Sequence, residues 1–155
     1  MDDEMRTLRR EVDRTAAERA VTRGIIAFAN GMDARDWDAV RALLTDDAEA
    51  EFGEGPVSGG DAIVASIRRY LDHCGPTQHL LGNVVVDVDL DAGTAHSVAA
   101  VHDLHLGTGE RASLTFATLG DYHDDWVRNA AGWRLSRRRK DSRAVVGSFD
   151  VFHRG

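Results

Sequence analysis

The chain has 155 residues, of which 43% are hydrophobic, and it carries a formal net charge of −7. A chain of this length can bury the core of one domain, and the hydrophobic share is ordinary for a folded protein. The acidic balance argues against a nucleic-acid binder, because neutralising phosphates requires a basic surface. The single cysteine, Cys74, excludes an internal disulfide and suits a reducing compartment.

No segment approaches the roughly 18 consecutive apolar residues that a membrane-spanning helix needs, and the N-terminus lacks a signal-peptide pattern. We therefore expect a cytoplasmic protein that binds neither membranes nor nucleic acid. We also expect one domain over residues 1–155, with its core at about 12–141 and a C-terminal tail at 142–155.

The first part of the chain has the periodicity of helices. Residues 1–10 are highly charged and are expected either to fray or to form a leading helical turn, whereas from residue 11 to Phe28 apolar side chains recur every three or four positions. Gly31 is the expected end of this helix, because glycine readily adopts the left-handed conformation that terminates helices. Asp36 is expected to cap a second helix that starts at Trp37.

After a third helix at about 61–73, the chain changes to the period of strands. Long segments rich in Val, Leu, Thr and aromatic residues are separated by short connections that contain glycine or asparagine. Together with one short early strand, the expected strands are 48–52, 79–90, 94–106, 111–127 and 132–140. Helices followed by antiparallel strands predict an α+β domain, with helices packed against one face of a curved sheet. The apolar residues of the tail predict that it packs either on this sheet or on a partner.

Three short segments carry a family resemblance: MDARDWD at 32–38, TQHLLGN at 77–83, and GDY at 120–122 leading to GWRL at 132–135. In them the chain resembles the SnoaL-like branch of the nuclear transport factor 2-like superfamily. That branch includes scytalone dehydratase, hexachlorocyclohexane dehydrochlorinase and polyketide cyclase-like proteins. The resemblance implies a cone-shaped α+β fold, in which three N-terminal helices and a curved antiparallel sheet enclose a deep pocket.

The resemblance also implies a site. In the dehydratase and the dehydrochlorinase, an aspartate after the first helix pairs with a histidine that opens the first long strand, and Asp33 and His79 match these positions. His105 matches a second pocket histidine of the dehydratase. Arg138 is the best match to an arginine on the last strand of the dehydrochlorinase, and Arg137 is the alternative if the strand register differs.

Two positions depart from the dehydratase. That enzyme has tyrosines that activate the substrate carbonyl through water, and the matching residues of this chain are Met32 and Phe52. The resemblance therefore does not imply scytalone as the substrate.

The residues themselves support proton transfer at His79. A histidine at the mouth of an apolar cavity can accept a proton at neutral pH. A carboxylate on its other ring nitrogen fixes the tautomer and stabilises the imidazolium that forms. Asp33 is the candidate for that carboxylate, and the alternative is a polar pair that only caps a helix end. On the expected strand, Leu81, Asn83 and Val85 share the face of His79.

A metal site is not indicated. His102 and His105 are three residues apart on a strand, so they face opposite sides of the sheet. The sequence has no helical pair of histidines and no carboxylate at ligand spacing. We therefore expect neither a metal nor a cofactor. His105 is either a pocket residue or a surface histidine at the end of a strand.

The other candidates would shape the pocket. Tyr122 either donates a hydrogen bond to a substrate oxygen or fills space between the strands. One inward arginine, with Arg138 as the candidate, can stabilise an enolate or a leaving anion. The walls are expected to be apolar, which suits an aromatic, polyketide-like or terpenoid substrate; the expected wall residues are Phe28, Met32, Trp37, Phe52, Leu114 and Phe116.

The leading prediction is a lyase or isomerase, of the dehydratase or cyclase type, that works through His79 and Asp33 without a cofactor. Two alternatives remain open: a non-catalytic ligand-binding or assembly module, and the small subunit of a ring-hydroxylating dioxygenase. The same fold serves many functions, so the fold alone does not decide between them. A sheet of this size commonly buries one face against a second copy, and we expect a homodimer or homotrimer.

Overall fold

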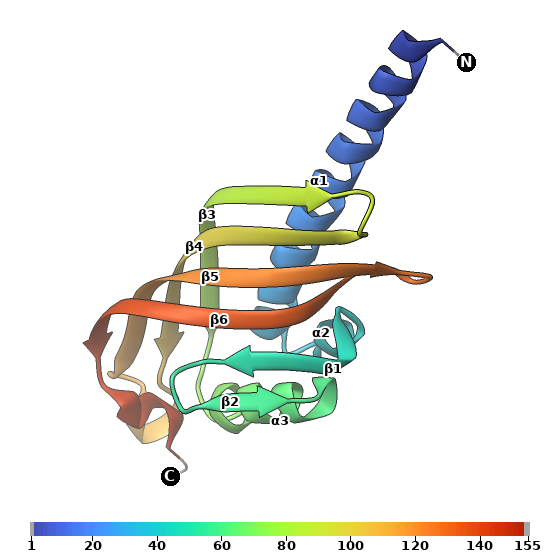
Figure 1. Cartoon of the computed structure of the whole chain (residues 1–155). Helices are drawn as coiled ribbons and strands as arrows, with labels where there is room; N and C mark the ends of the chain where they lie inside the picture. The colour runs from blue at the N-terminus through green and yellow to red at the C-terminus, as the bar shows by residue number, and fades with distance from the viewer. Residues whose placement is uncertain (1, 154–155) are drawn as a thin grey trace.

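The computed structural model describes residues 2–153. Within them, six strands form one sheet in the order β2-β1-β6-β5-β4-β3, and the long helix α1 crosses behind its long strands (Figure 1). The helices are α1 (Asp3–Ala34), α2 (Trp37–Ala42) and α3 (Gly60–Leu71), with the 3-10 helices η1 (Gly109–Arg111) and η2 (Phe149–Phe152). The strands are β1 (Leu44–Glu51), β2 (Pro56–Ser58), β3 (Thr77–Asp89), β4 (Thr94–Leu106), β5 (Thr115–Asn129) and β6 (Gly132–Gly147).

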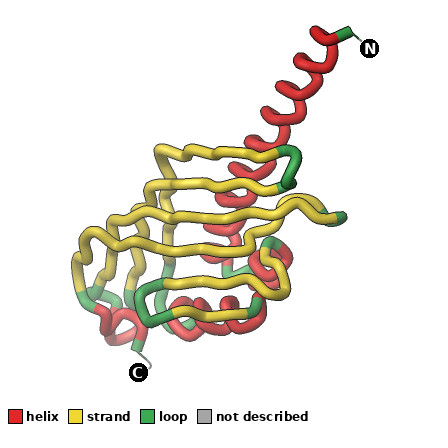
Figure 2. Tube along the Cα trace, viewed as in Figure 1, coloured by secondary structure: helices red, strands yellow, loops and turns green. Residues whose placement is uncertain are grey.

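The predicted α+β class and curved sheet are confirmed, with one correction to the strand pairing. β1 runs parallel to β6, whereas the other neighbouring strands are antiparallel. β2, which the sequence does not predict, lies in the glycine-rich connection before α3. The sheet stays open, with β2 and β3 as its two edges in the described part of the chain (Figure 2).

α1 is longer than the sequence predicts at both ends. It begins at Asp3, so residues 3–10 take the helical one of their two expected forms, and it continues past Gly31. Gly31 does not end the helix. It allows α2 to approach α1 closely, because a Cβ at Gly31 would lie 2.7 Å from Val40 Cγ2 of α2. The helix ends at Arg35, whose φ of 58° is left-handed. Asp33 is therefore fixed in the last turn of a helix.

The other boundaries follow the sequence with smaller shifts. Asp36 caps α2 as predicted, and its carboxylate accepts a hydrogen bond of 3.1 Å from the Ala39 backbone N–H. β5 begins only at Thr115, because η1 occupies the residues before it. β6 continues to Gly147, seven residues beyond its predicted end, since it keeps pairing with the start of β5.

A β-bulge divides β3. The register shifts between Gly82 and Val85, and Asn83 adopts a left-handed φ of 49°. Val85 is 58% exposed as a result, so the expectation that it shares the face of His79 is wrong. A bulge bends the strand that carries it, and Figure 1 shows β3 turning sharply along its length. The start of β3 can therefore line a cavity while its end packs on α1.

The core lies between α1 and the sheet. Trp126 of β5 is fully buried and donates a hydrogen bond of 3.0 Å from Nε1 to Ser97 Oγ. Its ring fits closely against α1, because a Cβ on Gly24 would lie only 2.8 Å away. No helix in residues 2–153 is long and apolar enough to cross a membrane.

The two ends of the described chain differ. The first turns of α1 project beyond the sheet (Figure 1), and their side chains are exposed. At the other end, Val151 and Phe152 of η2 are buried, as expected for a tail that packs on its own sheet, whereas Val146 and Phe149 remain exposed.

Candidate active site

A cavity of about 740 Å³ lies between α3, the β1–β2 hairpin, the inner face of β3 to β6 and η2. Its apolar wall includes Met32, Phe52, Tyr70, Phe116, Phe149 and Phe152. Its polar wall is formed by His79, Asp103, His105, Thr118, Tyr122 and Lys140. A groove of similar volume runs along the exposed half of α1. That groove is lined by a single helix and holds no histidine or aromatic residue, so we place the chemistry in the cavity.

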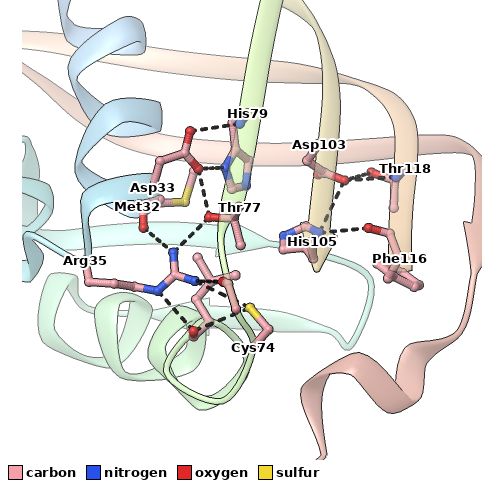
Figure 3. Close-up of polar contacts among 12 residues, drawn as sticks. Met32, Asp33, Arg35, Cys74, Thr77, His79, Asp103, His105, Phe116 and Thr118 are labelled. Atoms are coloured by element: carbon pink, nitrogen blue, oxygen red, sulfur yellow. Dashed lines mark hydrogen bonds and ion pairs between the residues drawn. The ribbon is translucent and has the colours of Figure 1, made fainter. Parts of the chain in front are cut away.

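His79 and Asp33 meet at the edge of this cavity (Figure 3). His79 Nδ1 lies 2.6 Å from Asp33 Oδ1, and the backbone N–H of His79 donates to Asp33 Oδ2 at 2.9 Å. The His79 side chain is only 5% exposed. A carboxylate accepts hydrogen bonds, so the contact selects the tautomer with a proton on Nδ1 and leaves the lone pair on Nε2. That nitrogen is the one available to a molecule in the cavity.

Asp33 is held in its ionised form. Burial on its own would raise the pKa of this carboxyl, but hydrogen bonds from the ring and backbone of His79 and from Thr77 outweigh it, and the pKa is lowered. Thr77 Oγ1 donates to Asp33 Oδ1 at 3.0 Å. A fixed negative charge beside His79 favours the imidazolium that forms when the ring accepts a proton.

Arg35 stabilises this junction by hydrogen bonds, a role that the sequence reasoning missed. Its guanidinium donates to the carbonyls of Met32 at 2.8 Å, Leu71 at 3.0 Å and Gly75 at 3.0 Å. It also donates to Thr77 Oγ1 at 2.8 Å. One side chain thereby joins the ends of α1 and α3 to the start of β3. The sequence feature that could have indicated this role is the segment MDARDWD, in which Arg35 directly follows the helix that carries Asp33.

Cys74 lies beside this arginine, with Sγ 3.4 Å from Arg35 Nη2. Burial raises the pKa of its thiol. A thiol that is held protonated is a poor nucleophile, which agrees with a structural role for Cys74.

His105 lines the cavity next to His79. The residue is 5% exposed, and its ring stands perpendicular to the His79 ring, with 5.5 Å between the two ring centroids. Nδ1 lies 3.3 Å from the Phe116 carbonyl oxygen. Burial lowers the pKa of His105 to about 4. The structure thus places His105 in the pocket as a neutral imidazole, and His102 on the exposed outer face.

A second charged pair on the polar wall is one that the sequence reasoning missed. Asp103 is 1% exposed and accepts hydrogen bonds from Thr118 N at 2.9 Å and Thr118 Oγ1 at 2.7 Å. Its other oxygen accepts a hydrogen bond from Lys140 Nζ. Strand parity could have indicated the pair, since Asp103 precedes His105 by two residues and Lys140 follows Arg138 by two.

Arg138 points inward but does not line the cavity. It is 2% exposed and donates to both oxygens of Asp124, at 2.8 and 2.7 Å. Its guanidinium lies over the ring of Phe28 at 4.3 Å and over the ring of Tyr122 at 4.1 Å. Arg138 therefore supports the wall from behind Tyr122, and Arg137 is exposed on the other face.

Some of the residues expected to form the cavity wall line the cavity and others do not. Met32, Phe52, Phe116 and Tyr122 line the cavity, and burial raises the pKa of the Tyr122 hydroxyl. Trp37 lies outside it, because it begins α2 on the side where the Arg68 guanidinium covers its ring at 5.8 Å. In residues 2–153, no group of three or more His, Cys, Asp or Glu side chains is placed to hold a metal ion.

Replacing Arg35 tests the junction. Arg35→Ala removes the donors to three carbonyls and to Thr77, and should lower the free energy of unfolding by roughly 2–4 kcal/mol. Arg143→Ala is the control, because Arg143 is 65% exposed and pairs only at the surface with Asp121; its effect should stay within about 0.5 kcal/mol. Urea unfolding of both variants measures the difference, and equal effects would contradict the role of Arg35.

The burial of His105 predicts a pH dependence of stability. A histidine whose folded-state pKa is depressed stabilises the fold above its unfolded pKa, and that stability is lost as the pH falls. For His105 the window runs from 6.5 down to about 4, and the loss should be roughly 2–4 kcal/mol. Asp33 and Asp103 have lowered pKa values, so their contributions are lost only below 3.8.

The measurement is urea unfolding at about pH 7 and about pH 4.5. His105→Gln should flatten the difference in stability between the two conditions. His102→Gln, on the outer face of the same strand, should leave that difference unchanged. A His105→Gln protein with the wild-type pH dependence would disprove the assignment.

Comparison with known proteins identifies the family. The chain matches the profile of the SnoaL-like domain over residues 13–139. The uncharacterized protein Rv2910c of Mycobacterium tuberculosis strain H37Rv is 30% identical over 118 residues, which cover 74% of this chain and 77% of that protein.

Solved structures share the fold. A protein from Novosphingobium aromaticivorans, proposed to be an aromatic ring hydroxylase, superposes with a TM-score of 0.80 and 24% identity, covering 90% of this chain and 98% of its own. A second protein of that organism, proposed to be a scytalone dehydratase, superposes with a TM-score of 0.78 and 22% identity, covering 88% of this chain and 91% of its own. Hexachlorocyclohexane dehydrochlorinase LinA-type3 from Novosphingobium barchaimii superposes with a TM-score of 0.77 and 17% identity, covering 89% of this chain and 94% of its own.

With its motifs and these matches in agreement, the chain belongs to the SnoaL-like domain family.

Proposed function

We propose that this protein is a cofactor-independent lyase or isomerase that acts on a small, largely apolar molecule, with His79 as the base. The observation that carries the proposal is the position of the His79 ring. It is 5% exposed, has Asp33 Oδ1 at 2.6 Å from Nδ1, and lines the cavity. A general base requires a ring whose tautomer is fixed through its far nitrogen, and the contact with Asp33 supplies this.

The chemistry begins with a proton transfer. Nε2 of His79 takes a proton from a carbon next to a carbonyl or a leaving group, and Asp33 stabilises the resulting imidazolium through Nδ1–H. Asp33 acts through His79 and is a positioning residue. Loss of a leaving group from the neighbouring carbon completes an elimination, and attack of the enolate on an internal electrophile completes a cyclisation.

The walls suggest the class of substrate. Apolar and aromatic side chains form much of the cavity lining, which favours an aromatic, polyketide-like or terpenoid molecule. Two of the structurally similar proteins are named for eliminations, as a dehydratase and a dehydrochlorinase. Met32 and Phe52 give this chain no hydroxyl at those two positions of the wall, so scytalone itself is not proposed.

The alternatives use the molecule differently. A non-catalytic module would bind a ligand in the same cavity without proton transfer at His79, and a dioxygenase small subunit would use its outer face to bind a partner chain. The expected homodimer or homotrimer stays a prediction. The outer face of the sheet offers exposed apolar side chains that a second copy would cover: Leu80, Leu104, Leu119 and Val146.

Hydrogen–deuterium exchange tests the base without knowledge of the natural substrate. The probe is 2-tetralone, an apolar aromatic ketone with acidic protons beside its carbonyl, incubated with the protein in D₂O and followed by NMR. The wild-type protein should accelerate exchange. His79→Gln should reduce that acceleration by roughly 100-fold or more, and Asp33→Asn by roughly 10- to 100-fold.

His102→Gln serves as the control, because His102 lies on the outer face of β4, and it should exchange the probe at the wild-type rate. Each variant is checked for its melting temperature first. Exchange that does not depend on His79 would refute the proposal.

A further inference from the structure

We propose that Lys140 binds the carbonyl oxygen of the substrate and stabilises the negative charge that develops there when His79 removes the neighbouring proton. This inference rests on the proposed function and adds the group that receives the charge.

Lys140 is placed for this role by β6. It pairs with Tyr122 of β5 and faces inward with Arg138, two residues earlier. Its side chain is 13% exposed and lines the cavity. Arg138 does not compete for the role, because Asp124 binds its guanidinium on both oxygens and two aromatic rings cover it.

Asp103 brings the ammonium group to the correct part of the wall. In the register of β3 and β4, Asp103 lies directly opposite His79. Thr118 fixes one oxygen of Asp103 by two hydrogen bonds, so the other oxygen is left for Lys140 Nζ. The ammonium group of Lys140 is thereby bound to Asp103, the residue that faces His79 across the two strands.

Lys140 keeps donors for a ligand. An ammonium has three N–H groups, and among residues 2–153 Asp103 is the one acceptor found for them. The other two N–H groups are available on the cavity side. Because its ammonium is ion-paired with the buried Asp103 carboxylate, Lys140 acts as a cationic donor and not as a nucleophile that forms a Schiff base.

The charges that the reaction creates both find partners. The C–H bond breaks, its proton goes to His79 Nε2, and its electron pair forms a C=C bond as the carbonyl electrons move to oxygen. The imidazolium then faces Asp33, and the enolate oxygen faces Lys140. Since the contact with Lys140 strengthens as the charge develops, it lowers the barrier more than it tightens binding of the ketone.

4-Nitrophenol tests the inference, because it is an aromatic enolate mimic whose ionisation is visible by absorbance. The absorbance is measured one pH unit below the midpoint of ionisation of free 4-nitrophenol, where about a tenth of the free compound is ionised. The wild-type protein should bind it mainly as the phenolate. Lys140→Met should bind it as the phenol, with an affinity for the phenolate about 10- to 100-fold weaker.

Two further variants control the result. Arg139→Gln changes the exposed neighbour on the outer face and should keep the phenolate band. Lys140→Met leaves Asp103 buried without its counter-charge, so the double variant Lys140→Met with Asp103→Asn removes both charges and should also lose the band. Melting temperatures confirm that each variant is folded.

A phenolate band that persists without Lys140 would overturn the inference, as would a wild-type protein that does not bind 4-nitrophenol or binds it without ionising it. The exchange of 2-tetralone separates this failure from that of the proposed function. Exchange that depends on His79 but not on Lys140 overturns the role of Lys140 alone. Exchange that depends on neither residue overturns the proposed function.

Discussion

The carboxylate of Asp33 joins the last turn of α1 to the first residues of β3. It accepts hydrogen bonds from the His79 backbone and from Thr77 and contacts the His79 ring, while Arg35 binds Thr77 and the backbone around it. The contacts that attach the helix to the edge strand are therefore the ones that orient the ring of the proposed base. The stability of the fold and the proposed function therefore depend on the same hydrogen bonds of Asp33.

The inner face of the sheet serves two purposes along its length. At one end Trp126 packs under α1, and at the other Asp103 and His105 line the cavity. The boundary is the buried pair of Arg138 and Asp124, which is fully hydrogen-bonded and therefore inert toward a ligand. The bend at the bulge of β3 makes this division possible, since a straight strand would continue along α1 and leave no hollow.

The order of helices and strands could be predicted from periodicity, and the pairing of Asp33 with His79 came from the family motifs. The bulge of β3 could not be predicted, because it depends on a left-handed Asn83 in the middle of a regular alternation. Arg138 and Lys140 show a second limit. Both have inward parity on β6, and only the position of Asp124 behind the wall decides that the arginine is satisfied in the core and the lysine reaches the cavity.

The arrangement of the walls also fixes how a substrate would lie. The polar groups project from β3 to β6, whereas the opposite side is closed by α3 and η2. There Phe152 lies 5.7 Å from the ring of Tyr70, 5.2 Å from Phe116 and 5.0 Å from His105. A ketone of the proposed class would lie with its oxygen toward Lys140 and its hydrocarbon body toward these aromatic rings. In the proposed reaction, apolar burial then holds the reacting carbon near His79, so that binding energy from the unreactive part of the molecule is used to orient the part that reacts.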